Sequence, residues 1–208
     1  MYSLFKKNKN NNVSIQILIE KLVKNEITIL EFEDAIYRDI KLEHVLGEVL
    51  YIELVSFNYK QKDGIYQLLK LVTDKVVTQD EVRRWQLQKL FSKYGWFEGR
   101  KVRLKRHKKS YSKAYDYATT ILKEFGGIEI EEINQDGYRR RGFLFFKQPS
   151  AGNIEGIGSV YFFAETDRSY SFIAVDEQGK YYVFIESVDL YFYCGEDFYK
   201  VMSYFLDR

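Results

Sequence analysis

Apolar residues recur at helical spacing from Val13 to residue 81 and predict a unit made only of helices. Ile15, Leu18, Ile19 and Leu22 lie three or four positions apart, and similar stripes follow them. Thr28-Ile-Leu-Glu31 and Thr78-Gln-Asp-Glu81 have the pattern of a capping box, in which the threonine and the glutamate satisfy backbone amides at a helix start. The pattern predicts helices over residues 13–24, 28–36, 39–58, 65–77 and 78–94.

Beyond these helices, apolar and polar residues alternate and predict strands. Val102 and Leu104 alternate with basic residues, as in an edge strand. A helix is then expected over residues 111–125, with Ser110 as its N-cap and Gly126 as the first residue past its end. Further strands are predicted over residues 128–133, 141–147, 158–164, 170–176 and 180–187, and a last helix is predicted after Gly195.

This order of elements predicts the α+β fold class. We expect an all-helical N-terminal unit over residues 1–81. A domain over residues 82–208 follows, in which helices pack on one face of a twisted antiparallel sheet. The chain of 208 residues is long enough for two such units.

The composition is that of a folded protein without a membrane segment. It is 46% hydrophobic and 30% charged, with one proline. No apolar run approaches the roughly 20 residues of a membrane helix, and polar residues interrupt the start where a signal peptide would lie. The single cysteine, Cys194, excludes an internal disulfide and favours a reducing compartment. We therefore expect a cytoplasmic protein with no membrane partner.

The titratable and nucleophilic residues show no pattern typical of catalysis. His44 and His107 have no second metal ligand at a suitable spacing, and Gly152–Gly158 lacks the lysine and helix of a phosphate-binding loop. Glu165 and Asp167 could form an acid–base pair, but we favour a surface turn or an acidic contact with a partner. We expect no catalytic residue, no metal and no cofactor.

Charge is distributed unevenly along the chain. Residues 82–125 carry 13 Lys/Arg against 3 Asp/Glu, whereas residues 149–208 carry 4 against 10. Eight of the basic residues lie between Arg100 and Lys113, close to several tyrosines. This run fits a solvated edge strand, a match for an acidic patch on another protein, or a nucleic-acid contact.

Aromatic residues gather in the predicted strands. Of the 36 aromatic residues, 15 lie between residues 161 and 205. Successive rings in a strand point to opposite faces of the sheet, so one face packs the helices and the other presents an aromatic surface. Such a surface is typical of a binding site, and either the N-terminal helical unit or a partner protein would cover it. The candidates for contact with a partner are Tyr161, Glu165, Asp167, Asp176, Glu177 and Tyr182.

Three motifs mark the second domain. In Gly95-Trp-Phe-Glu-Gly-Arg100, Trp96 could anchor the domain while Arg100 pairs with a carboxylate or caps a turn; alternatively, both are exposed contact residues. Phe125-Gly-Gly-Ile128 ends a helix and starts a strand. The third motif has two parts: Asp176-Glu-Gln-Gly-Lys180 joins two strands, and Cys194-Gly-Glu-Asp-Phe198 precedes the last helix. The marker residues are Gly95, Trp96, Gly99, Arg100, Phe125, Gly126 and Gly127.

These motifs resemble the SUKH superfamily, in particular its third immunity-protein branch, over residues 86–208. The resemblance implies a bacterial immunity protein of a polymorphic toxin system. Such an antitoxin binds a cognate protein toxin in the cytoplasm, often a nuclease or another nucleic-acid-directed toxin, in a one-to-one complex. From the residues alone, a nucleic-acid-binding or regulatory module that uses residues 100–113 is the alternative.

Overall fold

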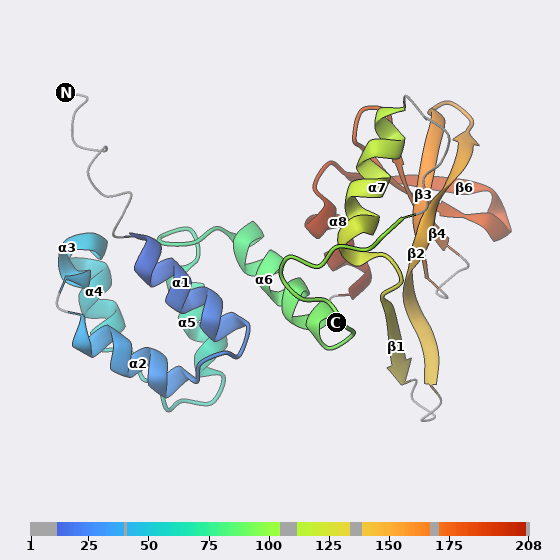
Figure 1. Ribbon diagram of the computed structural model, residues 1–208. Coiled ribbons are helices and arrows are strands. Elements are labelled where there is room, and N and C mark those ends of the chain that lie inside the picture. The colour runs from blue at the N-terminus through green and yellow to red at the C-terminus, as the bar shows by residue number, and fades with distance from the viewer. Residues whose placement is uncertain (1–11, 40, 105–111, 134–138, 167–170, 207–208) are drawn as a thin grey trace, which may run out of the picture. The chain divides into compact units, whose positions relative to one another are not determined.

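The computed structural model divides the chain into two compact units, residues 1–89 and residues 90–208 (Figure 1). The structure describes residues 12–39, 41–104, 112–133, 139–166 and 171–206. Helix α6 (Gln79–Ser92) contains the boundary between the units. The boundary expected from the sequence, between residues 81 and 82, lies near the start of the same helix.

The first unit is built from helices that share one apolar core. Ile15, Ile19, Phe32, Leu54 and Leu68 are each at most 1% exposed and belong to this core. Burying a side chain of this kind stabilises the fold by roughly 1.5–3 kcal/mol. The helices that precede α6 are α1 (Asn12–Val23), α2 (Ile29–Arg38), α3 (Leu42–Leu46), α4 (Glu48–Val55) and α5 (Gly64–Val72).

Both predicted capping boxes are present. The Glu31 amide donates to the Thr28 hydroxyl (3.2 Å), and the Thr28 amide donates to the Glu31 carboxylate (2.7 Å). Thr78 and Glu81 repeat this arrangement at 3.2 and 2.7 Å. The amide of Thr28, followed by its hydroxyl, lowers the pKa of Glu31. These two helix starts are therefore fixed by interactions within four consecutive residues.

The helix predicted over residues 39–58 is instead two helices, α3 and α4. Gly47 ends the first and begins the second, with a φ of +78°. This left-handed conformation interrupts the helical path and is strained for any residue with a β-carbon. The prediction was wrong because the apolar stripe continues on both sides of Gly47.

The second unit confirms the predicted α+β class with a six-stranded antiparallel sheet, in which each strand pairs with the next along the chain (Figure 1). This order requires only short connections between neighbouring strands. β2 is longer than the strand predicted over residues 141–147 and includes Gly152. β6 is a strand that was not predicted. The strands are β1 (Glu129–Ile133), β2 (Arg139–Ile154), β3 (Gly158–Thr166), β4 (Ser171–Asp176), β5 (Tyr181–Ile185) and β6 (Leu190–Gly195).

The edge strand predicted around Val102 and Leu104 is not a strand in its described part, residues 101–104. The amide of Val102 instead donates to the carbonyl of Lys123 (2.6 Å). The backbone here therefore binds the end of helix α7 (Lys113–Phe125).

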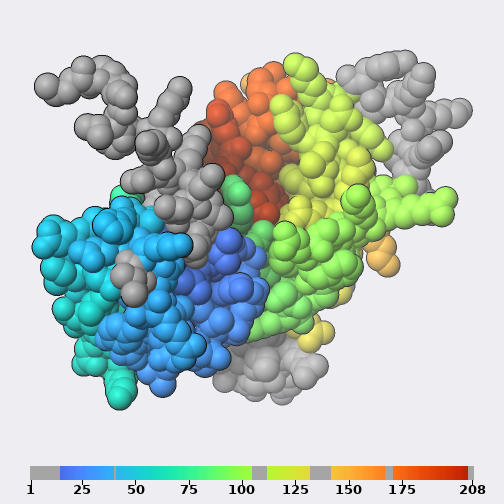
Figure 2. Space-filling view, turned by 60° about the vertical axis from the view of Figure 1, so that its left-hand side comes forward, coloured from blue at the N-terminus to red at the C-terminus, as the bar shows by residue number. Residues whose placement is uncertain are grey.

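Helices α7 and α8 (Phe198–Leu206) pack against the sheet. The Tyr117 ring of α7 lies beside Gly179 in the turn between β4 and β5, and yellow-green and orange-red atoms are in contact in Figure 2. Ser112 is the N-cap of α7 and accepts from the Tyr115 amide (3.2 Å). The predicted N-cap, Ser110, lies outside the described residues.

The Trp96–Arg100 corner binds the C-terminal end of α7. The indole N–H of Trp96 donates to the Glu124 carboxylate (3.0 Å), and its ring stacks on Phe125 with centroids 6.4 Å apart. The Arg100 guanidinium donates to the carbonyls of Glu124 and Gly126, the latter at 2.9 Å. Trp96 is 8% exposed, so it is a buried anchor.

The Gly126-Gly127 pair lets this helix end pass directly into the sheet. Gly126 is the C-cap residue, and a β-carbon there would lie 2.4 Å from the Leu122 carbonyl oxygen. Gly127, the next residue, has the left-handed conformation, with a φ of +76°. Gly95 and Gly99 also have positive φ values.

Candidate binding surface on the open face of the sheet

Side chains alternate between the two faces of the sheet, and α7 and α8 pack on the same face. Phe163 of β3 and Tyr181 of β5 contact Phe198 of α8, with ring centroids 6.3 and 6.4 Å apart. Tyr161 of β3 contacts Tyr115 of α7 at 5.3 Å. Adjacent residues of each regular strand segment point the other way. We call that opposite side the open face.

The open face contains a hollow with aromatic walls. Its volume is about 310 Å³. The ring of Phe162 lies 6.0 Å from that of Phe172 and 6.1 Å from that of Phe184, measured between centroids. Glu186 is exposed and supplies a carboxylate at the rim. The residues that line the hollow are Phe146, Ser150, Phe162, Phe172, Phe184 and Glu186.

A small apolar cluster supports one wall of this hollow. Ile154 and Val160, at the end of the β2–β3 hairpin, pack with Ala174 of β4. Ile157 and Phe162 pack against these three residues. Phe162 therefore belongs to both the cluster and the hollow, and its ring packs against the cluster while it forms a wall of the hollow.

The aromatic surface continues from the hollow toward β6. Phe184 lies directly opposite Tyr191, and Tyr182 lies opposite Tyr193, so each pair shares one face. The rings of Tyr182 and Tyr193 are 5.8 Å apart. Tyr191 and Tyr193 are 42% and 57% exposed. The open face therefore presents a continuous run of aromatic groups across β4, β5 and β6.

Two candidate contact residues, Asp176 and Tyr182, form an internal network. Asp176 is 2% exposed and accepts from the Tyr182 hydroxyl (3.0 Å), the Gln178 amide (2.9 Å) and the Lys180 amide (2.8 Å). Burial, followed by the bond to Asp176, raises the pKa of Tyr182 to about 12. The pair holds the β4–β5 turn, and its burial removes it from the accessible contact surface.

We predict that Tyr182→Phe lowers the free energy of unfolding at neutral pH by about 1–2 kcal/mol, because the buried Asp176 loses a hydrogen-bond donor. A tyrosine whose pKa is raised by folding stabilises the protein fully below its unfolded pKa of about 10. That stabilisation is lost as the pH rises through about 12. Urea unfolding at increasing alkaline pH measures both effects. Tyr204→Phe, at an exposed site, is the control and leaves both the stability and its pH dependence unchanged.

The other acidic candidates have different surroundings. The Glu177 carboxylate accepts from the Lys113 amide (2.9 Å) and from the Ser112 hydroxyl, so it caps the start of α7. Asp167 lies outside the described residues. Glu165 lies opposite Phe172 in the β3–β4 pair and therefore shares the open face with the hollow.

Tyr161, the remaining candidate, lies on the helix-covered face. Its contact with Tyr115 places it beneath α7 and away from the open face. The hollow residues Phe172 and Phe184 were not among the candidates. The signal that could have indicated them is the apolar alternation within the predicted strands 170–176 and 180–187.

The basic run Arg100–Lys113 is described only at its ends. Arg100 binds the carbonyls at the end of α7, so its guanidinium has a structural role. Lys101, Arg103 and Lys113 are exposed. Residues 105–111, which hold four of the other basic side chains, lie outside the described part of the chain.

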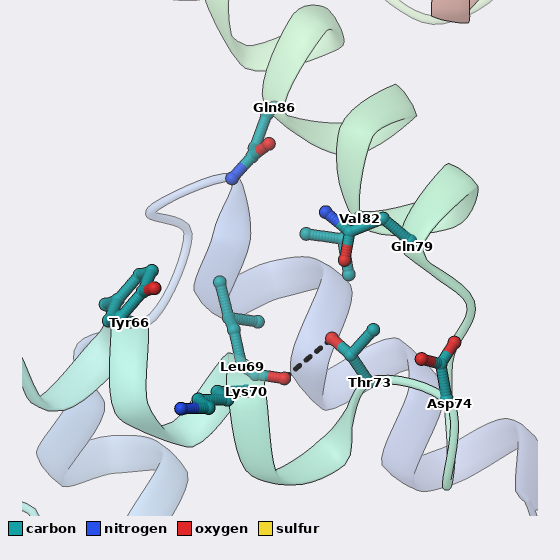
Figure 3. Close-up of a pocket in the computed structure, with 8 residues that line it drawn as sticks. All are labelled: Tyr66, Leu69, Lys70, Thr73, Asp74, Gln79, Val82 and Gln86. Atoms are coloured by element: carbon teal, nitrogen blue, oxygen red, sulfur yellow. Dashed lines mark hydrogen bonds between the residues drawn. The ribbon is translucent and has the colours of Figure 1, made fainter.

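The first unit has its own hollow of about 340 Å³ between α5 and α6, shown in Figure 3. The Thr73 hydroxyl donates to the Leu69 carbonyl (2.6 Å), while Lys70 points away from Asp74 (Figure 3). The charged groups do not converge on one point. Within the described ranges, no cluster of His, Cys, Asp or Glu could hold a metal. Burial raises the pKa of Cys194, so less of the reactive thiolate is present at neutral pH.

Comparison of the chain with protein-family models, curated proteins and solved structures gives no match. Among the helices that the structure describes, none has the length and apolar character needed to cross a membrane. What the protein binds must therefore be inferred from the chemistry of its own surfaces.

Proposed function

We propose that this protein is a bacterial immunity protein that neutralises a cognate toxin by stoichiometric binding in the cytoplasm, as the resemblance to the SUKH superfamily implies. The observation that carries the proposal is the open face, where a phenylalanine-lined hollow adjoins exposed tyrosines. Covering such a surface with another protein removes apolar area from water, while tyrosine hydroxyls can keep polar partners. The protein acts by covering the toxin and needs no cofactor.

The charge around the open face supports a basic partner. Glu186 lies at the rim of the hollow, and Glu165 lies opposite Phe172 on the same face. Proteins that act on nucleic acids present basic surfaces to phosphates, so a nuclease or related toxin would match this charge. Opposite charges would also accelerate the encounter of the two proteins.

A second candidate function is nucleic-acid binding through the basic segment 100–113. It is supported by the exposed side chains of Lys101 and Arg103. Each phosphate contact steepens the loss of affinity with added salt. Titration with duplex and single-stranded nucleic acid at increasing salt measures this alternative directly.

We expect the adjacent upstream gene to encode a large protein with a C-terminal toxin domain, and co-expression with that domain tests the proposed function. We expect the wild-type protein to restore growth and to bind the purified toxin domain in a one-to-one complex. Glu186→Arg places a positive charge at the rim, and Phe172→Ala removes one wall of the hollow. Each change should weaken toxin binding by about tenfold or more, because central aromatic and paired charged residues dominate interface energies.

Phe97→Ala is the matched control, because Phe97 is 62% exposed and lies outside the open face. Far-ultraviolet circular dichroism and thermal unfolding establish that each variant is folded. If Phe172→Ala loses stability, Glu186→Arg still tests the open face, because Glu186 is exposed and its replacement removes no buried packing. Failure of the wild type to protect, or equal protection by both open-face variants, would overturn the proposal.

A further inference from the structure

Strand β6 forms one edge of the sheet and presents large apolar side chains there. It pairs with β5 on one side, and no described strand pairs with its other side. Leu190, Tyr191, Phe192 and Tyr193 are 42–57% exposed. Every second residue of an edge strand directs its amide and carbonyl outward, so β6 offers a backbone to which another strand can bind.

The sequence of β6 lacks the features that protect edge strands from pairing. Leu190-Tyr-Phe-Tyr-Cys-Gly195 contains no charged residue and no proline. The opposite edge, β1, reads Glu129-Ile-Glu-Glu-Ile133 and carries three carboxylates along its length. Charged side chains discourage pairing with another chain, so the two edges of the same sheet differ in this respect.

Acidic residues lie at both ends of β6. Glu186 and Asp189 precede the strand, whereas Glu196 and Asp197 follow it, and the chain contains no Lys or Arg between Lys180 and Lys200. An antiparallel pair of two β6 strands would bring the acids at the start of one copy close to those at the end of the other. Like charges at both ends therefore disfavour a second copy of this chain as the occupant.

We propose that β6 is a strand-addition site for an extended apolar segment with Lys or Arg at its ends, contributed by the toxin. The statement that the toxin contributes this segment rests on the proposed function. Backbone hydrogen bonds along β6 supply affinity, and the flanking ion pairs fix the register. On the open face, the added strand continues the aromatic surface beyond Tyr191 and Tyr193, next to the hollow.

A synthetic peptide, Lys-Lys-Val-Thr-Val-Thr-Val-Lys-Lys, tests the site without the toxin. We expect it to bind the full-length protein at least about tenfold more tightly than a peptide with Glu in place of Lys. N-methylation of alternate peptide amides should abolish binding, because it removes the donors that a strand supplies. Hydrogen exchange of the β6 amides should slow when the peptide is bound, while exchange in β1 should not change.

Two substitutions locate the peptide. Phe192→Lys places a charge on the edge and should weaken binding by about tenfold or more, whereas Tyr204→Lys, on the exposed side of α8, should not. The pair Glu186→Lys with Glu196→Lys leaves one Lys and one Asp at each end of β6, so the preference for the Lys peptide over the Glu peptide should be lost. Circular dichroism and β6 exchange in the free protein verify that the variants keep their sheet.

The inference is overturned if the Lys peptide does not bind, if protection appears outside β6, or if Phe192→Lys binds as tightly as the wild type. It is also overturned if sedimentation shows a dimer of this chain that Phe192→Lys dissociates. Peptide binding at β6 without growth protection would refute the toxin-neutralising function while leaving the edge site. Growth protection by a protein that binds no peptide would refute the edge site and leave the toxin-neutralising function in place.

Discussion

Replacing Phe125 with alanine is expected to lower the free energy of unfolding of the second unit by about 3–5 kcal/mol. Phe125 is 2% exposed and lies at the end of α7. Its ring contacts the sheet, helix α8 and the Trp96–Arg100 corner. Alanine would leave a cavity that the surrounding rings cannot fill without moving. The ring centroids around Phe125 belong to Phe91 (5.0 Å), Phe198 (5.1 Å), Phe145 (5.4 Å), Trp96 (6.4 Å) and Tyr199 (6.4 Å).

The two tryptophans make this measurement specific to one unit. Trp85 belongs to the core of the first unit, and Trp96 stacks on Phe125 in the second. A Trp85→Phe background leaves Trp96 as the fluorescent reporter during urea unfolding. Phe97→Ala in the same background is the control, with an expected change below about 0.5 kcal/mol because Phe97 is exposed. Equal unfolding midpoints for the two variants would contradict the assigned role of Phe125.

Elements that depend on local interactions could be predicted from the sequence. The capping boxes at Thr28 and Thr78 need only residues within the same helical turn, and both are found. The Asp176–Lys180 turn is likewise determined locally, because Asp176 accepts the amides of Gln178 and Lys180. Short-range hydrogen bonds of this kind leave a direct pattern in the sequence.

The elements that were missed depend on contacts between distant residues. Val102 was assigned to an edge strand because of its alternating neighbours, yet its amide binds Lys123 at the end of α7. β6 was not predicted because its apolar residues are consecutive, without the alternation that marks a half-buried strand. Its pairing with β5 determines its conformation.

The open-face hollow could be predicted only in outline. An aromatic face opposite the helices follows from alternation, but the hollow requires Phe146, Phe162, Phe172 and Phe184 to converge from four strands. Their convergence depends on register irregularities between Phe145 and Ser150 and between Phe162 and Ala164. An irregularity of one residue moves the following side chains to the other face, and no sequence pattern reveals it.

The candidate contact residues show the same limit of prediction from sequence. Asp176 and Glu177 are acidic and lie in a turn, which is also the pattern of a surface contact. The structure uses both carboxylates internally, one to bind Tyr182 and the other to cap α7. A carboxylate that satisfies a buried hydroxyl or a helix N-terminus cannot be distinguished by sequence from one that awaits a partner.

After Phe125, the Arg100 guanidinium is expected to make the next largest contribution to the stability of the second unit. Arg100→Ala should lower the free energy of unfolding by about 2–3 kcal/mol, because hydrogen bonds to charged groups contribute more than neutral ones. The last carbonyls of a helix have no partner within it, and a cation there interacts favourably with the helix dipole. Arg100 donates to two of these groups, the carbonyls of Glu124 and Gly126.

Geometry distinguishes this role from a simple effect of charge. A lysine at position 100 keeps the positive charge but lacks the planar fork that reaches both carbonyls, so Arg100→Lys should restore less than half of the loss. Lys101→Ala, at the exposed neighbouring position, should change the stability by less than about 0.5 kcal/mol. The Trp96 fluorescence of the Trp85→Phe background follows each variant in urea. If Arg100→Lys matched the wild type, charge alone would explain the residue; if Arg100→Ala matched Lys101→Ala, the corner would not hold α7 at all.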